Sequence, residues 1–154
     1  MAAGICNGRI RMWEEVKGTW SGRKAKELYE GGVIKTLRKE FPDRTTYALL
    51  EDNDPTGFKS GEGKRAKKAL KIQTVDLPTY SPDLNPLDFA LWKNIEDRVL
   101  KKKMDGKESR KAYADRLRRA ALRTSKKTVE GTLSQIKDRI KEVIKHKGKA
   151  IPSD

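Results

Sequence analysis

Short apolar runs and turn signals alternate at the start of the chain. Ala2–Cys6 is apolar and is followed by Asn7-Gly8, the dipeptide that most strongly favours a two-residue hairpin turn. Arg9–Val16 (RIRMWEEV) then alternates apolar and polar positions, as a half-buried strand does. The pattern predicts that the chain opens with a β-hairpin.

The remaining periodicity predicts alternating helices and strands, followed by helices alone. The helix after the hairpin is interrupted near Gly31-Gly32 and ends before Pro42. Strands are predicted at 45–50 and 72–77, and helices at 21–39, 64–71, 87–103, 110–123 and 128–147. This order of elements predicts a mixed α/β sheet with helices on its faces.

The segment TYSPDLNPLDFALW, residues 79–92, is a stiff and acidic entrance to a helix. Asn85 is a favourable N-cap, and Pro86 suits the first helical position because its missing N–H would have no partner there. Asp88 then falls in the first turn, near the positive end of the helix dipole. An acid at this position is an ordinary capping device, so a structural and a functional role both stay open.

Asp52 lies at the carboxyl end of the predicted strand at 45–50, where open α/β sheets place their sites. A turn-forming role is the alternative for Asp52, and Asp54 before Pro55 is typical of a turn. Together, Asp52 and Asp88 could hold hard cations such as Mg²⁺. Two such ions about 4 Å apart activate water and stabilise the leaving oxygen in phosphodiester cleavage.

Positive charge is concentrated in the last third of the chain. The net charge is +14, with 18 Lys and Arg against 15 Asp and Glu in residues 1–100, and 18 against 7 in residues 101–154. Such a basic block favours a polyanionic partner, most often nucleic acid, although a solvated lysine-rich surface is the alternative. The candidate phosphate contacts are Arg65, Lys67, Lys68, Lys71, Lys101, Lys102 and Lys103.

The composition also limits the class of protein. Cys6 is the single cysteine, so no internal disulfide forms, and with one histidine a zinc site is not expected. No apolar run approaches the roughly 20 residues of a membrane span. The N-terminus is too soon polar for a signal peptide. We expect a protein that is neither secreted nor embedded in a membrane.

Two segments resemble mariner-like DDE/DDD transposases. The run YSPDLNPLDFALW resembles the family signature in which SPDLNP or SPDLAP leads into a helix with the third catalytic acid. Leu49–Asn53 (LLEDN) resembles the strand that ends in DN and carries the second catalytic Asp. Asp52 and Asp88 are separated by 35 residues, close to the usual gap of the family. The resemblance covers most of the chain.

The resemblance implies an RNase H-like fold and Mg²⁺- or Mn²⁺-dependent cleavage and joining of DNA ends. Asp52 matches the second metal-binding acid and Asp88 the third. No residue matches the first acid, which lies in the family on a strand before the opening hairpin; Glu14 or Glu15 is an alternative, but both lie on the wrong strand. The N-terminal helix-turn-helix region of the family has no counterpart either.

The resulting expectation is an RNase H-like mixed sheet that lacks its first strand, flanked by helices. Residues 1–103 would form the partial catalytic domain, and residues 104–154 its basic C-terminal helices. The expected function is that of a partial transposase catalytic domain, inactive alone. The alternative is a non-enzymatic DNA-binding module, or a decayed or domesticated fragment. DNA is the expected partner, with a homodimer through an exposed sheet edge, in the nucleus of a eukaryote or otherwise in the cytoplasm.

Overall fold

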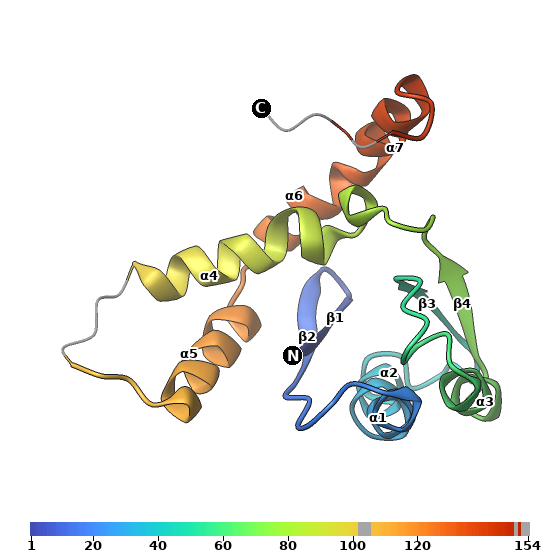
Figure 1. Ribbon diagram of the computed structural model, residues 1–154, viewed down its shortest axis with the longest axis horizontal. Helices are drawn as coiled ribbons and strands as arrows, with labels where there is room; N and C mark the ends of the chain where they lie inside the picture. Colours follow the sequence, from blue (N-terminus) through green and yellow to red (C-terminus); the bar gives the residue numbers. More distant parts are fainter. Residues whose placement is uncertain (102–105, 150, 152–154) are drawn as a thin grey trace. The chain divides into compact units, whose positions relative to one another are not determined.

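The computed structural model describes residues 1–101, 106–149 and 151 (Figure 1). The chain forms two compact units, one of Met1–Asn7 with Arg11–Tyr80 and one of Gly8–Ile10 with Ser81–Asp154. We call them unit 1 and unit 2 and describe each by itself. The expected boundary between residues 103 and 104 lies outside the described residues. No helix in the described part of the chain is long and apolar enough to cross a membrane.

The predicted hairpin is confirmed. Strands β1 (Ala2–Cys6) and β2 (Arg9–Glu14) form a two-stranded sheet. The two turn residues, Asn7 and Gly8, have φ values of 50° and 66°. A type I′ turn requires positive φ at both central residues, which asparagine and glycine tolerate best. This local chemistry explains why the hairpin could be predicted from a dipeptide.

The next helical stretch contains the predicted interruption. Helix α1 (Gly22–Leu28) passes into a widened π-helical turn, η1 (Tyr29–Val33), and then into α2 (Ile34–Glu40). A Cβ atom on Gly32, within η1, would lie 2.9 Å from the side chain of Glu14. The glycine therefore lets this turn approach the end of β2 closely, and the helix widens here without breaking.

Strands β3 (Tyr47–Glu51) and β4 (Ile72–Asp76) pair in parallel and are joined by α3 (Gly61–Ala69). The register places Glu51 opposite Asp76. Because parallel strands end at the same edge of a sheet, the residues that follow β3 and β4 share one edge. The helix begins earlier than predicted, since Ser60 accepts a hydrogen bond from the Gly63 N–H at 3.0 Å and so caps it.

One hydrophobic core joins these elements of unit 1. Its members come from β2, the helical stretch at 22–40, both parallel strands and α3. They are Met12, Ala25, Leu28, Tyr29, Val33, Ile34, Leu37, Tyr47, Ala66 and Ile72. The core members from β3 and β4 are Tyr47 and Ile72, the first residue of each strand, so the core fixes the amino ends of the pair.

Apart from Gly8–Ile10, the described part of unit 2 begins with a 3-10 turn, and its other regular elements are helical. Its elements are η2 (Pro82–Leu84), the π-helical turn η3 (Leu87–Leu91), α4 (Trp92–Leu100), α5 (Arg110–Leu122), α6 (Lys126–Ser134) and α7 (Ile136–Lys145). Its buried apolar side chains include Leu84, Leu91, Ile95, Val99, Ala121 and Val129. The helix predicted at 87–103 is seen from Leu87 to Leu100, and residues 102 and 103 lie outside the described residues.

The single helix predicted at 128–147 is wrong, because α6 ends at Ser134 and α7 begins at Ile136. Between them, the Gln135 N–H bonds to the Thr132 carbonyl at 3.2 Å, in a tighter turn than that of an α-helix. The Ser134 hydroxyl also donates to the Gly131 carbonyl at 2.9 Å. Such hydroxyl-to-backbone bonds compete with regular helix, and apolar periodicity does not reveal them.

Candidate functional site

Asp52 lies on the edge where β3 and β4 end. Its side chain is exposed, and its Oδ1 accepts a hydrogen bond from the Asp54 N–H at 3.2 Å. The side-chain amide of Asn53 donates to the carbonyl of Leu77, which follows β4. The DN pair thus has two distinct tasks: Asn53 ties the two strand ends together, and Asp52 presents a carboxylate at their edge.

A buried polar network surrounds the side chain of Glu51, the residue that precedes Asp52. Glu51 forms an ion pair with Lys67, and the two side chains are 8% and 6% exposed. The Tyr29 hydroxyl donates to Glu51 Oε2 at 2.6 Å, and the Lys67 ammonium lies 5.4 Å from the centre of the Tyr29 ring. Burial, and then the hydrogen bond to Glu51, raise the pKa of Tyr29 far above its usual range.

This network corrects one sequence expectation. The sequence makes Lys67 a candidate phosphate contact, but the residue is 5% exposed and its ammonium is paired with Glu51. A buried pair of this kind is strongly destabilised if one partner is removed, because the other charge stays buried. Lys67 therefore supports the end of β3 from inside unit 1.

Asp54 organises the loop that follows. It accepts hydrogen bonds from the Trp20 indole at 2.6 Å and from the backbone N–H groups of Thr56, Gly57 and Phe58 at 3.1, 2.7 and 3.2 Å. Burial alone would raise the pKa of Asp54, but these hydrogen bonds outweigh it and hold the pKa below its usual value. The turn role predicted for this residue is confirmed.

Asp88 is held at the beginning of its helix by two side chains. Helical backbone starts at Pro86, and Asn85 Oδ1 accepts from the Leu87 N–H at 3.2 Å, which confirms the predicted cap. The Asn85 amide also donates to Asp88 Oδ2 at 2.8 Å, while the Trp92 indole donates to Asp88 Oδ1 at 3.1 Å. Each carboxylate oxygen therefore receives a hydrogen bond that fixes its direction.

The start of this helix is also anchored by α7. The Arg139 guanidinium lies 4.0 Å from the centre of the Phe89 ring, and it donates to the Asp83 carbonyl at 3.4 Å. The Asp83 carboxylate in turn accepts from the Ile151 N–H at 3.0 Å. The acidic SPDLNP segment is thus held at Asp83 by hydrogen bonds from Arg139 and from Ile151. Sequence reasoning missed Arg139, whose only signal was a basic residue on an amphipathic helix.

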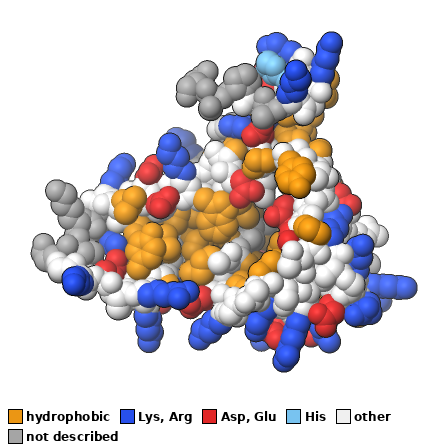
Figure 2. All heavy atoms as spheres, in the orientation of Figure 1, with side chains coloured by type: hydrophobic (Ala, Val, Ile, Leu, Met, Phe, Trp, Pro, Cys, Tyr) orange, Lys and Arg blue, Asp and Glu red, His pale blue; other side chains and the backbone are white. Residues whose placement is uncertain are grey.

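The other predicted basic residues do not all lie together, although Lys68 and Lys71 line the same pocket. Arg65, Lys68, Lys71 and Lys101 are exposed, whereas Lys102 and Lys103 lie outside the described residues. Figure 2 shows Lys and Arg side chains at many places around the visible face. Charge alone therefore does not mark out a binding surface.

Carboxylates suit Mg²⁺ and Mn²⁺ in type, but the two candidates belong to different units. Asp52 lies in unit 1 and Asp88 in unit 2, and each is positioned by contacts within its own unit. In the described part of the chain, no group of three or more His, Cys, Asp or Glu residues could hold a metal ion. The paired role of Asp52 and Asp88 therefore stays a prediction.

No protein-family model matches the sequence, and no curated protein matches it. Solved structures do match. The Mos1 transposase catalytic domain with Raltegravir and Mn has a TM-score of 0.82 and 15% identity, over 97% of this chain and 76% of that chain. The Mos1 mariner paired-end complex with Mn has a TM-score of 0.78 and 15% identity, over 95% of this chain and 43% of that chain.

These matches define the fold. The chain has an RNase H-like mixed α/β fold, as the sequence predicted. More narrowly, it is similar to the catalytic domain of Mos1 mariner transposase, with a TM-score of 0.81 against the crystal structure of that domain. The resemblance to mariner-like transposases is thereby confirmed at the level of the fold.

Proposed function

We propose that the chain is a part of the catalytic domain of a mariner-like DNA transposase. The observation that carries the proposal is the Asp88 carboxylate, held by Asn85 and Trp92 at the start of a helix in this fold. The same residues form the SPDLNPLD signature.

In this proposal, Asp52 and Asp88 hold Mg²⁺ or Mn²⁺. Solved structures of the similar Mos1 domain with Mn and with Mg support this choice of ions. When bound, the ions activate a water and stabilise the leaving oxygen of a phosphodiester. The protein's own groups direct the carboxylates: Asn85 and Trp92 act on Asp88, while the Asp54 loop and Asn53 fix the backbone around Asp52.

The proposed substrate is DNA. Similar Mos1 structures include a paired-end complex with the left transposon end and a strand transfer complex. The net charge of +14 agrees with such a partner. With DNA as the proposed partner, we also propose that the protein acts in the nucleus of a eukaryotic cell, or otherwise in the cytoplasm.

We further propose that this chain alone cleaves DNA little or not at all. It offers a match to two of the three family acids, and two carboxylates do not readily fix two ions with the water between them. The second candidate function is therefore non-enzymatic DNA binding, which the basic residues 101–154 favour.

A homodimer is part of the proposal, and light scattering that finds only monomer at high concentration would contradict it.

Calorimetric titration of Mn²⁺ tests the proposed site. The chain is compared with an Asp52→Ala/Asp88→Ala variant, and with an Asp43→Ala/Asp97→Ala variant that removes two other exposed carboxylates. We expect binding that is lost in the first variant and retained in the second. Absence of binding in the unaltered chain, or equal loss in both variants, would contradict a metal site at Asp52 and Asp88 and favour the DNA-binding module.

A further inference from the structure

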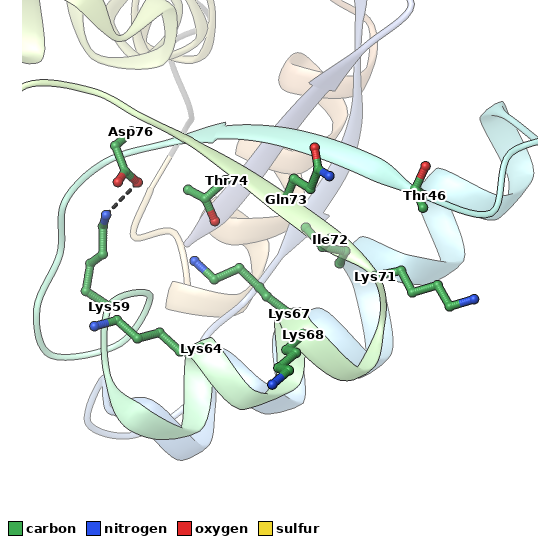
Figure 3. Close-up of a pocket in the computed structure, with 10 residues that line it drawn as sticks. All are labelled: Thr46, Lys59, Lys64, Lys67, Lys68, Lys71, Ile72, Gln73, Thr74 and Asp76. Carbon is green, nitrogen blue, oxygen red and sulfur yellow. Dashed lines mark ion pairs between the residues drawn. The ribbon is translucent and has the colours of Figure 1, made fainter.

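Unit 1 contains a pocket of about 470 Å³ beside α3 and β4 (Figure 3). Ten residues line it, of which five are lysines and one, Asp76, is an acid. The lysines are Lys59, Lys64, Lys67, Lys68 and Lys71. A concave surface with this excess of one sign of charge concentrates ions of the opposite sign.

Two of the five lysines are already neutralised. Lys59 pairs with Asp76 at 2.5 Å, and Lys67 pairs with Glu51. The other three, Lys64, Lys68 and Lys71, are exposed, and no ion pair joins them to another residue within the described ranges. The uncompensated charge of the pocket therefore resides on these three side chains.

Lys64 and Lys68 lie four residues apart on one face of α3. Lys71 follows the end of the helix and lines the same pocket. The helix packs closely against the loop that precedes it, because a Cβ atom on Gly63 would lie 2.5 Å from the Gly57 carbonyl oxygen. The side chains of Lys64 and Lys68, by contrast, are exposed.

Their directions favour an extended anion over a compact one. Figure 3 shows that the ammonium groups of Lys64, Lys68 and Lys71 fan out along the pocket and do not converge on one point. At a rise of about 1.5 Å per residue, Lys64 and Lys68 are about 6 Å apart along the axis of α3, and Lys71 lies beyond the end of the helix. One DNA strand advances about 3.4 Å per phosphate, so the separation of Lys64 and Lys68 corresponds to about two phosphate steps.

Lys71 occupies a costly backbone position. It follows α3 with a φ of 55°, in the left-handed region where helices usually place glycine. Its carbonyl accepts the Tyr47 N–H at 3.2 Å, which ties this conformation to the start of β3. A non-glycine residue is destabilised by about 1 kcal/mol there, and strain of this kind gathers at functional positions.

We propose that Lys64, Lys68 and Lys71 bind the phosphodiester backbone of a DNA strand across this pocket. The inference rests on the proposed function only in taking DNA as the partner. Gln73, Thr46 and Thr74 line the same pocket and offer uncharged hydrogen-bonding groups to phosphate and sugar oxygens. Contacts of this type hold the backbone without reading its sequence.

The test measures DNA affinity against salt. A fluorescein-labelled duplex of arbitrary sequence is titrated with the full chain at several KCl concentrations, and its anisotropy is recorded. The pocket variant is Lys64→Gln/Lys68→Gln/Lys71→Gln. Its matched control, Lys35→Gln/Arg38→Gln/Lys39→Gln, removes three positive charges from α2 in the same unit.

We expect the pocket variant to bind the duplex more weakly. The slope of its log affinity against log salt concentration should be smaller by about one for each phosphate that a lysine no longer neutralises. The control should keep the slope of the unaltered chain. A Lys→Arg variant at the same three positions should retain both. Circular dichroism verifies that each variant is folded, and the single Lys64→Gln and Lys68→Gln variants give the same comparison if the triple variant does not fold.

Two results would overturn the inference and leave DNA as the partner. Equal losses of affinity in the pocket variant and the control would mean that only net charge matters, and an unchanged pocket variant would place the DNA-binding residues elsewhere. If the unaltered chain does not bind the duplex even at low salt, the proposed DNA partner fails together with the pocket.

Discussion

Trp92 donates its indole N–H at 3.1 Å to the carboxylate of Asp88, which lies four residues earlier in the same helix. The tryptophan thereby directs one oxygen, while Asn85 directs the other. The motif NPLDFALW therefore holds its acid with residues on both sides. These two hydrogen bonds explain why an asparagine and a tryptophan lie on either side of the acid at the start of this apolar helix.

Trp92→Phe keeps an aromatic ring but removes the hydrogen bond to Asp88. If Asp88 binds a metal ion, the less directed carboxylate should lower Mn²⁺ affinity about fivefold, which corresponds to about 1 kcal/mol for one hydrogen bond. Calorimetric titration measures the change. Tyr47→Phe is the control, since its hydroxyl donates to the Arg44 carbonyl and to neither Asp52 nor Asp88. Equal affinities of Trp92→Phe and the unaltered chain would show that the hydrogen bond does not position a ligand.

Arg139→Ala removes the stack on Phe89 and the bond to the Asp83 carbonyl. We expect a loss of stability of about 1 kcal/mol, seen as a lower midpoint in thermal unfolding. Arg139→Lys should recover only part of it, because an ammonium cannot stack as a planar guanidinium does. Lys137→Ala, at an exposed position of the same helix, should change little. A full recovery by lysine would mean that charge alone matters.

Lys67→Met should be among the most destabilising single changes, because it leaves Glu51 buried without its ion-pair partner. The expected loss is about 3 kcal/mol in urea unfolding. Combining it with Glu51→Gln should restore part of that loss, since the remaining amide carries no charge. Additive losses in the double variant would show that the two side chains are not coupled.

Asp54 gives the stability a pH dependence of defined sign. Its pKa is lowered in the folded protein, so the charged form contributes stability that is complete above the unfolded pKa of about 3.9. That contribution is lost as the pH falls through the lower, folded pKa. Urea unfolding should therefore find Asp54→Asn less stable than the unaltered chain at neutral pH, with the difference shrinking below about pH 4. A difference independent of pH would contradict this account.

Local chemistry could be predicted from the sequence, and contacts between distant residues could not. The hairpin follows from Asn7-Gly8 and the helix cap from Asn85, because each acts on backbone groups within three residues. By contrast, no helical pattern distinguishes Lys67, which pairs with Glu51, from its exposed neighbour Lys68. Resemblance to a family supplied the fold, since periodicity predicted only a mixed sheet with helices.

The left-handed backbone conformation of Lys71, after α3, has a consequence for attempts to stabilise this protein. Lys71→Gly should relieve about 1 kcal/mol of backbone strain and raise the unfolding temperature. The same change removes one of the three uncompensated charges of the pocket. A screen for thermal stability alone would thus select Lys71→Gly, and with it a chain that binds a polyanion more weakly. At this position, thermal stability and affinity for a polyanion are opposed.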